Sequence, residues 1–249
     1  MKKMYFAVLV VLLTFCTSCE FSETIYINDD GSGKLSMYLD GSELMPMMGT
    51  QMTGGQEQSI DSMISFKDMF KGNSKFISEI SDTDRKMIKS LENLNAHMVL
   101  DTKKNKFNVD LFTDFKSVND IQEMFGAVNS LAKIAKNSNA MGSGNPLTNT
   151  NIDKLTKMNY SYDTKTFKRA LNIMDKGLMD KLKENLGQAE MLLAASTYKL
   201  NYHFPRKIKS VSDENAVMAE DGKSFSVKVN ALEFVNNPEM LNLEVELEK

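Results

Sequence analysis

The sequence has 249 residues, of which 42% are hydrophobic and 25% are charged, and its formal net charge is −3 at pH 7. These values are typical of a chain that forms one large globular domain or two small ones. Acidic and basic residues are interspersed without a dense basic block, which argues against nucleic-acid binding. Both cysteines, Cys16 and Cys19, lie near the N-terminus, so no disulfide is expected in the folded domain.

The first eighteen residues have the three-part layout of an export signal. A basic start is followed by an apolar stretch over residues 4–15 and then by Cys16-Thr17-Ser18, directly before Cys19. The apolar stretch is shorter than the roughly 20 residues that span a bilayer as a helix, which favours a cleaved segment over a permanent transmembrane anchor. Residues 1–18 are therefore predicted to be a signal peptide.

The end of this segment resembles a lipobox, the signal of bacterial lipoproteins. Small residues precede a cysteine in this signal, and Thr17, Ser18 and Cys19 match it, whereas Cys16 stands where leucine is usual. The resemblance implies cleavage before Cys19, a diacylglycerol thioether on its sulfur, and a further fatty acyl chain, such as palmitate, on the new amino group. Each buried CH₂ contributes about 0.8 kcal/mol, so two or three chains make the attachment effectively permanent.

Cleavage before Cys19 leaves 231 of the 249 residues and changes the formal charge from −3 to −5, because two lysines are removed. Lipid then blocks the sulfur of Cys19, so the mature chain has no free thiol. We expect residues 19–249 to form a single exported α+β domain that is stabilised by its own core.

The exported chain is predicted to begin with a β-hairpin. Residues 24–28 and 34–39 are β-type runs, and the segment Asn28-Asp29-Asp30-Gly31-Ser32-Gly33 accepts the positive φ angles of tight turns. The same segment superficially resembles a calcium loop, but Leu39 occupies the place of the bidentate Glu and β patterns flank it. A plain turn is therefore favoured. The short connection to Cys19 should hold the domain close to the membrane.

Two later segments lack a regular apolar period and are predicted to be flexible, residues 41–60 and 137–151. Apolar spacing between them predicts two helices, two strands and a third helix, over residues 61–70, 81–94, 95–101, 106–114 and 118–136. The two strands should pair as a second hairpin. Its turn holds Lys103-Lys104-Asn105-Lys106, which we interpret as a solvated turn rather than a phosphate-binding patch.

The C-terminal part is predicted to contain one long helix among strands. Residues 158–162 alternate as a strand, and residues 167–196 carry a helical pattern. Gly177 and Gly187 each weaken this helix by about 1 kcal/mol relative to alanine and allow a break. Three further strands have one apolar and one polar face, over residues 198–204, 225–229 and 241–247. This alternation indicates an antiparallel sheet whose apolar face is covered, and we expect helices to cover it.

This order of elements resembles the LppM-like family of bacterial lipoprotein domains. The likeness is strongest over residues 19–40 and 197–249. It rests on Cys19, the hairpin around Asp30-Gly31-Ser32-Gly33, and the motifs Phe204-Pro205-Arg206-Lys207-Ile208 and Asp221-Gly222-Lys223. The resemblance implies an α+β domain with a curved antiparallel sheet packed on one face by several helices, and a role in binding lipid or glycolipid. No ligand-contacting residue carries over from the family.

Candidate catalytic groups are few in this sequence. The histidines His97 and His203 lie in strand patterns without a neighbouring Cys, His or Asp at ligand spacing, and no G-x-S-x-G motif occurs. Histidine is the usual base near neutral pH. We therefore predict a non-enzyme without metal or cofactor. Carboxylates such as Asp110 and Asp114 would support an enzyme only if they converged in a pocket with another polar group.

Methionine is the compositional anomaly, with nineteen residues, of which seventeen follow the predicted cleavage site. Met45, Met47, Met48 and Met52 cluster around Pro46. Clustered thioethers suit core or loop packing, an adaptable surface for lipid or a partner, or a Cu(I) site in an exported compartment. A copper site would require these four side chains to face a common point.

The function we predict is that of a membrane-anchored, non-enzymatic lipoprotein of the cell envelope, facing the periplasm or the cell surface, which binds a lipid, another apolar ligand or a protein partner. The alternatives are a lipoprotein that scaffolds an envelope assembly and a Met-rich Cu(I)-binding protein. A deep apolar groove would favour the ligand binder, whereas a filled core with an exposed apolar patch would favour the scaffold.

Overall fold

The computed structural model describes residues 19–46, 54, 56–72, 78, 80–125 and 155–249. Within them the chain forms an eight-stranded and a four-stranded β-sheet, together with α-helices and short 3-10 turns. The predicted α+β class is therefore confirmed, with more strand than helix. That residues 19–249 form one exported domain stays a prediction.

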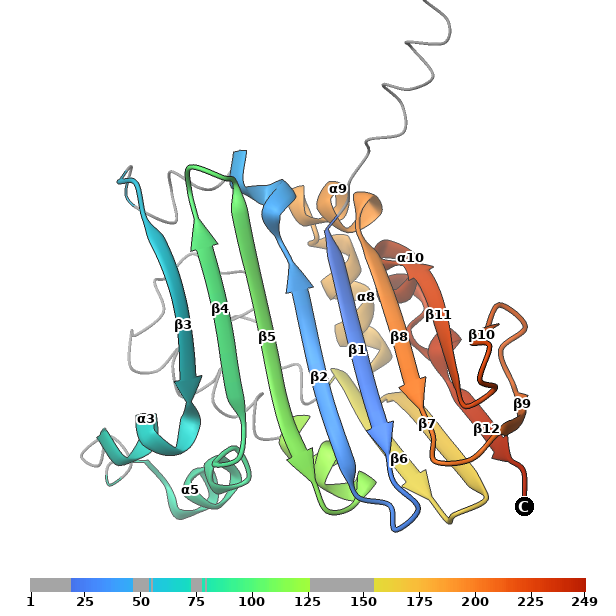
Figure 1. Cartoon of the computed structure of the whole chain (residues 1–249). Helices are drawn as coiled ribbons and strands as arrows, with labels where there is room; N and C mark the ends of the chain where they lie inside the picture. The colour runs from blue at the N-terminus through green and yellow to red at the C-terminus, as the bar shows by residue number, and fades with distance from the viewer. Residues whose placement is uncertain (1–18, 47–53, 55, 73–77, 79, 126–154) are drawn as a thin grey trace, which may run out of the picture.

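The larger sheet has the strand order β10-β11-β8-β1-β2-β5-β4-β3 (Figure 1). Its strands are β1 Glu20–Ile27, β2 Gly33–Asp40, β3 Ser59–Ser65, β4 Asn95–Asp101, β5 Lys106–Phe115, β8 Thr197–His203, β10 Val217–Met218 and β11 Ser224–Asn230. The two predicted hairpins, β1–β2 and β4–β5, are both confirmed as antiparallel pairs.

One pair in this sheet contradicts the prediction of a wholly antiparallel sheet. Strands β1 and β8 run parallel, with Glu20 beside Thr197 and Tyr26 beside His203. A tight turn fixes antiparallel pairing only for strands that follow one another in the chain. β1 and β8 lie far apart in sequence, so their alternation patterns reveal their faces but not their relative direction. The sheet curvature implied by the family resemblance stays a prediction.

The smaller sheet is antiparallel throughout and has the order β6-β7-β12-β9. Its strands are β6 Thr156–Tyr162, β7 Thr166–Ile173, β9 Ile208–Val211 and β12 Leu243–Leu247. The prediction of a helix starting at Phe167 is wrong, because β7 occupies this segment. Phe167, Arg169 and Leu171 all point inward at exposures of 0%, 1% and 6%. Because Arg169 is charged, only Phe167 and Leu171 stand out as apolar among these inward residues. They are four positions apart, which is also the spacing of residues on one side of a helix.

The first predicted helix, residues 61–70, is wrong over its N-terminal half. The structure has strand β3 followed by helix α3, Phe66–Gly72. Ile60 and Ile64 are half-buried on one side of β3 with the polar Ser62 between them, so the strand has no unbroken apolar alternation by which the sequence would predict it. Strand β3 pairs with β4 at the edge of the larger sheet.

The remaining described helices are α5 Asp82–Lys89, α8 Lys176–Glu184, α9 Gln188–Ala195 and α10 Ala231–Asn236, with 3-10 turns at Ser42–Leu44 and Pro238–Leu241. Residues 118–125 are helical as predicted. Of the two positions at which a break was allowed, Gly187 separates α8 from α9 with a φ of +53°, whereas Gly177 lies inside α8. The predicted flexible segment 137–151 lies outside the described residues. Residues 47–53 and 55 of the other predicted flexible segment, residues 41–60, also lie outside them.

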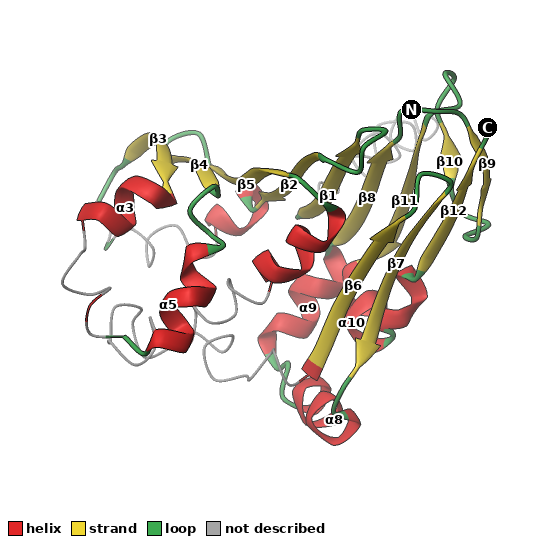
Figure 2. Ribbon diagram, turned by 90° about the horizontal axis from the view of Figure 1, so that it is seen from below, coloured by secondary structure: helices red, strands yellow, loops and turns green. Residues whose placement is uncertain are grey.

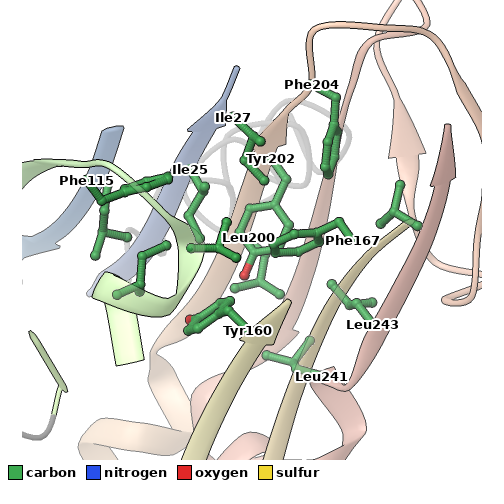
Figure 3. Packing of buried hydrophobic residues seen from close by; sticks show 14 of the residues in the cluster. Ile25, Ile27, Phe115, Tyr160, Phe167, Leu200, Tyr202, Phe204, Leu241 and Leu243 are labelled. Atoms are coloured by element: carbon green, nitrogen blue, oxygen red, sulfur yellow. The ribbon is translucent and has the colours of Figure 1, made fainter. Parts of the chain in front are cut away.

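The core lies between the two sheets and under the helices, which are on the same side of the larger sheet (Figure 2). Tyr160 and Phe167 of the smaller sheet point toward Leu200 and Tyr202 of the larger one (Figure 3). The rings of Phe167 and Tyr202 meet edge to face with centroids 5.4 Å apart. A second sheet, which the sequence does not predict, therefore covers the centre of the apolar face.

Candidate functional site

The predicted lipid-attachment residue, Cys19, lies directly before the first strand. Strand β1 begins at Glu20, and the carbonyl oxygen of Cys19 accepts a hydrogen bond from the backbone N–H of Thr197 at 2.9 Å. Its side chain lies beside the hydroxyl of Ser196, the residue that ends helix α9. The cysteine is only 6% exposed, and this burial raises the pKa of the thiol. The folded domain therefore holds Cys19 firmly and begins immediately after it.

A buried ion pair joins the two sheets four residues further along. Glu23 of β1 and Arg169 of β7 are each 1% exposed, and Arg169 Nη2 lies 3.5 Å from Glu23 Oε2. Arg169 Nη1 also donates a hydrogen bond of 2.9 Å to the carbonyl oxygen of Leu241. The guanidinium thus bridges the first strand and the C-terminal segment of the chain.

Three tyrosines complete the surroundings of the carboxylate. Tyr160 and Tyr202 donate to Glu23 Oε1, the former at 2.9 Å, and Tyr198 donates to Oε2 at 3.0 Å. Burial, and then the negative charge of Glu23, raise the pKa of all three hydroxyls. Burial alone would lower the pKa of Arg169, but Glu23 and the tyrosines together raise it well above its ordinary value. The tyrosines therefore remain donors and the arginine remains charged.

This arrangement, which we call the Glu23 cluster (Glu23, Tyr160, Arg169, Tyr198 and Tyr202), is suited to structure rather than to reaction. The carboxylate accepts from four donors, and no residue of the cluster is exposed. A buried ion pair adds little net stability, but removing one partner leaves an uncompensated charge that costs about 3–5 kcal/mol. The cluster therefore fixes how the smaller sheet sits on the larger one.

Sequence reasoning missed the Glu23 cluster, although a signal for it exists. Glu23 is in phase with the buried Ile25 and Ile27 of β1, and Arg169 is in phase with Phe167 and Leu171 of β7. A charged residue at an inward position of a strand is rarely buried without a partner. Two such residues of opposite charge indicate a buried pair, but their pairing across two sheets requires the topology.

The two histidines lie on the opposite, outer face of the larger sheet. His97 Nε2 is 2.8 Å from Asp61 Oδ1, an acidic neighbour from β3 that no ligand spacing along the sequence indicates. The imidazole of His203 stacks on Tyr26 with ring centroids 4.2 Å apart, and burial lowers its pKa. Four inter-strand steps separate β4 from β8, or about 19 Å at about 4.8 Å each. The histidines therefore belong to separate environments.

The carboxylates singled out from the sequence do not converge. Asp110 accepts a hydrogen bond of 2.6 Å from the hydroxyl of Ser36 and lies opposite His97 in the register of β4 and β5. Asp114 is four residues along the same strand, which separates the two Cα atoms by about 13 Å. Asp114 instead borders two clefts.

Among the described residues, two clefts stand out at the end of the larger sheet away from Cys19. The first has a volume of about 660 Å³ and is lined about equally by polar and apolar surface, with Asp114, Lys116 and Asp120 beside Phe115 and Met124. The second, of about 320 Å³, lies beside the β1–β2 turn. Both are open to solvent, so neither is a deep apolar groove.

The residues that a calcium or Cu(I) site would need either contact other groups or lie outside the described residues. Asp30 Oδ1 accepts from the backbone N–H and the hydroxyl of Ser32 at 2.9 Å and 2.6 Å, as in a plain turn. Met45 is 4% exposed and belongs to the core, whereas Met47, Met48 and Met52 lie outside the described residues. Over the described ranges, no group of three or more His, Cys, Asp and Glu side chains is placed to hold a metal ion.

The outer face of the larger sheet is polar and faces the viewer in Figure 1, with the helices behind it. Cross-strand neighbours there include Asn201 and Thr24, whose side chains are hydrogen-bonded at 3.3 Å, and Lys199 opposite Lys228. Large apolar side chains are exposed at several places, namely Tyr26, Met63, Met174, Met191, Val217 and Met218. Of the helices in the described part of the chain, none has the length and apolar character needed to cross a membrane.

The sequence matches no protein-family model and no curated protein. Among solved structures, the chain is similar to the NMR structure of the folded domain of the LppM protein from Mycobacterium tuberculosis. The likeness covers 92% of this chain and 89% of that chain, with a TM-score of 0.36 and 7% sequence identity. A TM-score this low does not establish a shared fold, so membership of the LppM-like family stays a prediction.

Proposed function

We propose that the protein is a lipoprotein of the bacterial cell envelope, cut before Cys19 and held on a membrane by acyl chains on that residue. The observation that carries this proposal is the coincidence of two boundaries. The lipobox-like segment ends at Cys19, and the first strand of the folded domain begins at Glu20. A cut at this position removes the whole predicted signal and leaves every described strand intact.

The burial of Cys19 bears on the order of events in this proposal. A thiol that is 6% exposed and beside Ser196 is a poor substrate for a modifying enzyme, because burial suppresses the reactive thiolate. Acylation must then occur while the N-terminal segment is still in the membrane, before β1 pairs with β8. Folding afterwards places the modified residue at the edge of the domain.

For the exported domain we propose a non-enzymatic role in binding a protein partner, with a scaffold in an envelope assembly as its simplest form. The described space between the sheets is filled by aromatic side chains and the Glu23 cluster. The two clefts are open and partly polar, which suits a small apolar ligand poorly. The outer face of the larger sheet keeps polar side chains such as Asn201, Lys199 and Lys228 accessible, and this broad surface supports a macromolecular partner instead.

Lipid attachment is tested by replacing each cysteine in turn in the full chain. Cys19→Ala is expected to abolish incorporation of labelled palmitate and to release the protein from the membrane fraction. Cys16→Leu is the matched control, because leucine is the usual residue there, and it should behave as the unaltered chain does. Retention of label and membrane association by Cys19→Ala would exclude the proposed anchor.

The binding role is tested on protein extracted from its native membrane in mild detergent. A partner protein that co-purifies after chemical crosslinking is the result expected for an assembly component. A single lipid species bound at one copy per chain, besides the covalent acyl chains, would instead favour the apolar-ligand binder.

A further inference from the structure

We infer that helix α9 is a membrane-contact element whose exposed apolar side lies against the lipid bilayer when Cys19 carries its acyl chains. The inference rests on the proposed lipid attachment and adds to it the surface of the domain that faces the membrane. Three observations carry it: the composition of α9, its position beside Cys19, and the absence of any spacer between Cys19 and β1.

Helix α9 is almost wholly apolar, although one side of it faces solvent. Its sequence, Gln188-Ala189-Glu190-Met191-Leu192-Leu193-Ala194-Ala195, contains polar side chains only at its first and third positions. Leu192 and Leu193 are partly buried, whereas Met191 is 65% exposed and Ala194 and Ala195 are exposed as well, with Glu190 as the acidic residue at the N-terminal edge of this side. A surface helix normally carries polar residues on its solvent side, as the lysine-rich α8 does. The exposed side of α9 therefore suits an apolar or interfacial environment.

This helix lies next to the predicted attachment residue. Its C-terminal cap is Ser196, whose side chain is beside that of Cys19, and the following residue, Thr197, is hydrogen-bonded to the carbonyl oxygen of Cys19. At a rise of about 1.5 Å per residue, Met191 is about 8 Å from Ser196 along the helix axis. Figure 1 shows α9 at the end of the sheet where β1 starts.

No spacer separates the attachment residue from the folded domain. Glu20 already pairs with Thr197 in the sheet, so the sulfur of Cys19 stands about one side-chain length from fixed backbone. A diacylglycerol on that sulfur has its glycerol at the membrane interface. Helices that bind this interface lie about 5–10 Å into it, which is comparable with the axial distance of Met191 from Ser196, the residue beside Cys19. The bilayer is thus the surface that α9 meets first.

The neighbouring elements at this end of the domain set the depth of the contact. The β4–β5 turn carries Lys103 and Lys104, whose exposed ammonium groups pair with Glu57 at 3.0 Å and Asp101 at 3.2 Å. Such polar groups belong at the level of the lipid headgroups. The predicted contact is therefore shallow, with Met191 at the boundary of headgroups and acyl chains and the polar turn in the headgroup layer.

The mature chain offers a direct test, because acylation of Cys19 leaves it without a free thiol. A spin label is placed on Met191→Cys in one sample and on Met63→Cys in another, and each protein is reconstituted in vesicles of neutral phosphatidylcholine. Met63 is the matched control, since it is a methionine of similar exposure, 62%. It lies on β3, four strands from β1. Intact mass spectrometry of both samples records whether Cys19 is acylated.

Electron paramagnetic resonance then compares collisions of each label with oxygen, which concentrates in lipid, and with a water-soluble nickel chelate. The label at position 191 is expected to collide several-fold more with oxygen than with nickel, and the label at position 63 to show the reverse. Equal and high nickel accessibility at both positions in an acylated protein would overturn the inference while leaving the lipid anchor intact. An unacylated Cys19 would overturn the anchor and, with it, this inference.

Discussion

Two carboxylates of the larger sheet, Glu23 and Asp110, lie on opposite faces and illustrate how differently the two faces are built. Glu23 is 1% exposed and accepts from an arginine and three tyrosines. Asp110 is half-buried on the open face, accepts from Ser36 and lies opposite His97. The inner face tolerates a charge only because a full set of partners surrounds it, which makes that face part of the architecture. The outer face keeps its polar groups accessible, which leaves it free to bind.

The largest expected effect comes from removing the buried cation. Arg169→Met should lower the free energy of unfolding by about 3–5 kcal/mol, because Glu23 is then buried without its counter-ion. The adjacent Lys168→Met is the matched control. Its ion pair with Glu244 at 3.0 Å is about half exposed and is worth at most about 1 kcal/mol. Urea unfolding measures the free energy of unfolding of both variants, and equal losses would contradict the contrast between the buried and the exposed ion pair.

A smaller effect is expected from a single hydroxyl of the Glu23 cluster. Tyr202→Phe removes one hydrogen bond to a charged group while keeping the ring that packs against Phe167, so a loss of about 1.5–3 kcal/mol is predicted. On the open face, Tyr26→Phe should change the free energy of unfolding by less than about 0.5 kcal/mol. Thermal unfolding of both variants checks this, and a neutral Tyr202→Phe would argue that the hydroxyl contributes nothing to the cluster.

Asp110→Asn tests whether the carboxylate on the outer face of the larger sheet contributes to stability. The amide oxygen can still accept from Ser36, and water can reach the group, so the expected change in the free energy of unfolding is within about 0.5 kcal/mol. If urea unfolding instead showed a loss as large as that of Arg169→Met, the outer face would also be a structural surface.

The smallest predicted effect is a dependence of stability on pH at His203. Burial lowers the pKa of its imidazole in the folded state below the ordinary 6.5, so the unfolded chain binds the proton more readily than the folded chain does. The free energy of unfolding should therefore fall as the pH drops from about 6.5 through the lower folded-state pKa. His203→Phe keeps a ring stacked on Tyr26 but cannot titrate. The free energy of unfolding of this variant should decline less between pH 7 and pH 5. An equal decline in the two proteins would show that His203 is not the source of the pH dependence.

Much of the fold was predictable from alternation within strands. The β1–β2 and β4–β5 hairpins, the strand at residues 198–204 and the break at Gly187 all follow from local patterns. The errors at β3 and β7 have one cause. Each strand places a polar or charged residue at an inward position, which interrupts the apolar alternation, and in β7 the remaining apolar residues are then four apart, as in a helix.

What the sequence could not reveal depends on contacts between distant segments. The parallel pairing of β1 with β8 and the packing of the smaller sheet are not encoded in any short pattern. The partners of Glu23 come from β6, β7 and β8, so the Glu23 cluster becomes visible only once these strands are placed together. Cys19 is different, because the signal that marks it is local and precedes the folded domain.

The central claim, lipid attachment at Cys19, is tested most directly by intact and peptide mass spectrometry of the mature protein purified from its native membrane. The account predicts an N-terminal peptide that starts at Cys19 and carries the mass of a diacylglyceryl group, with a further acyl chain on the amino group. An N-terminus that still includes residues 1–18, or a peptide that contains an unmodified Cys19, would contradict it.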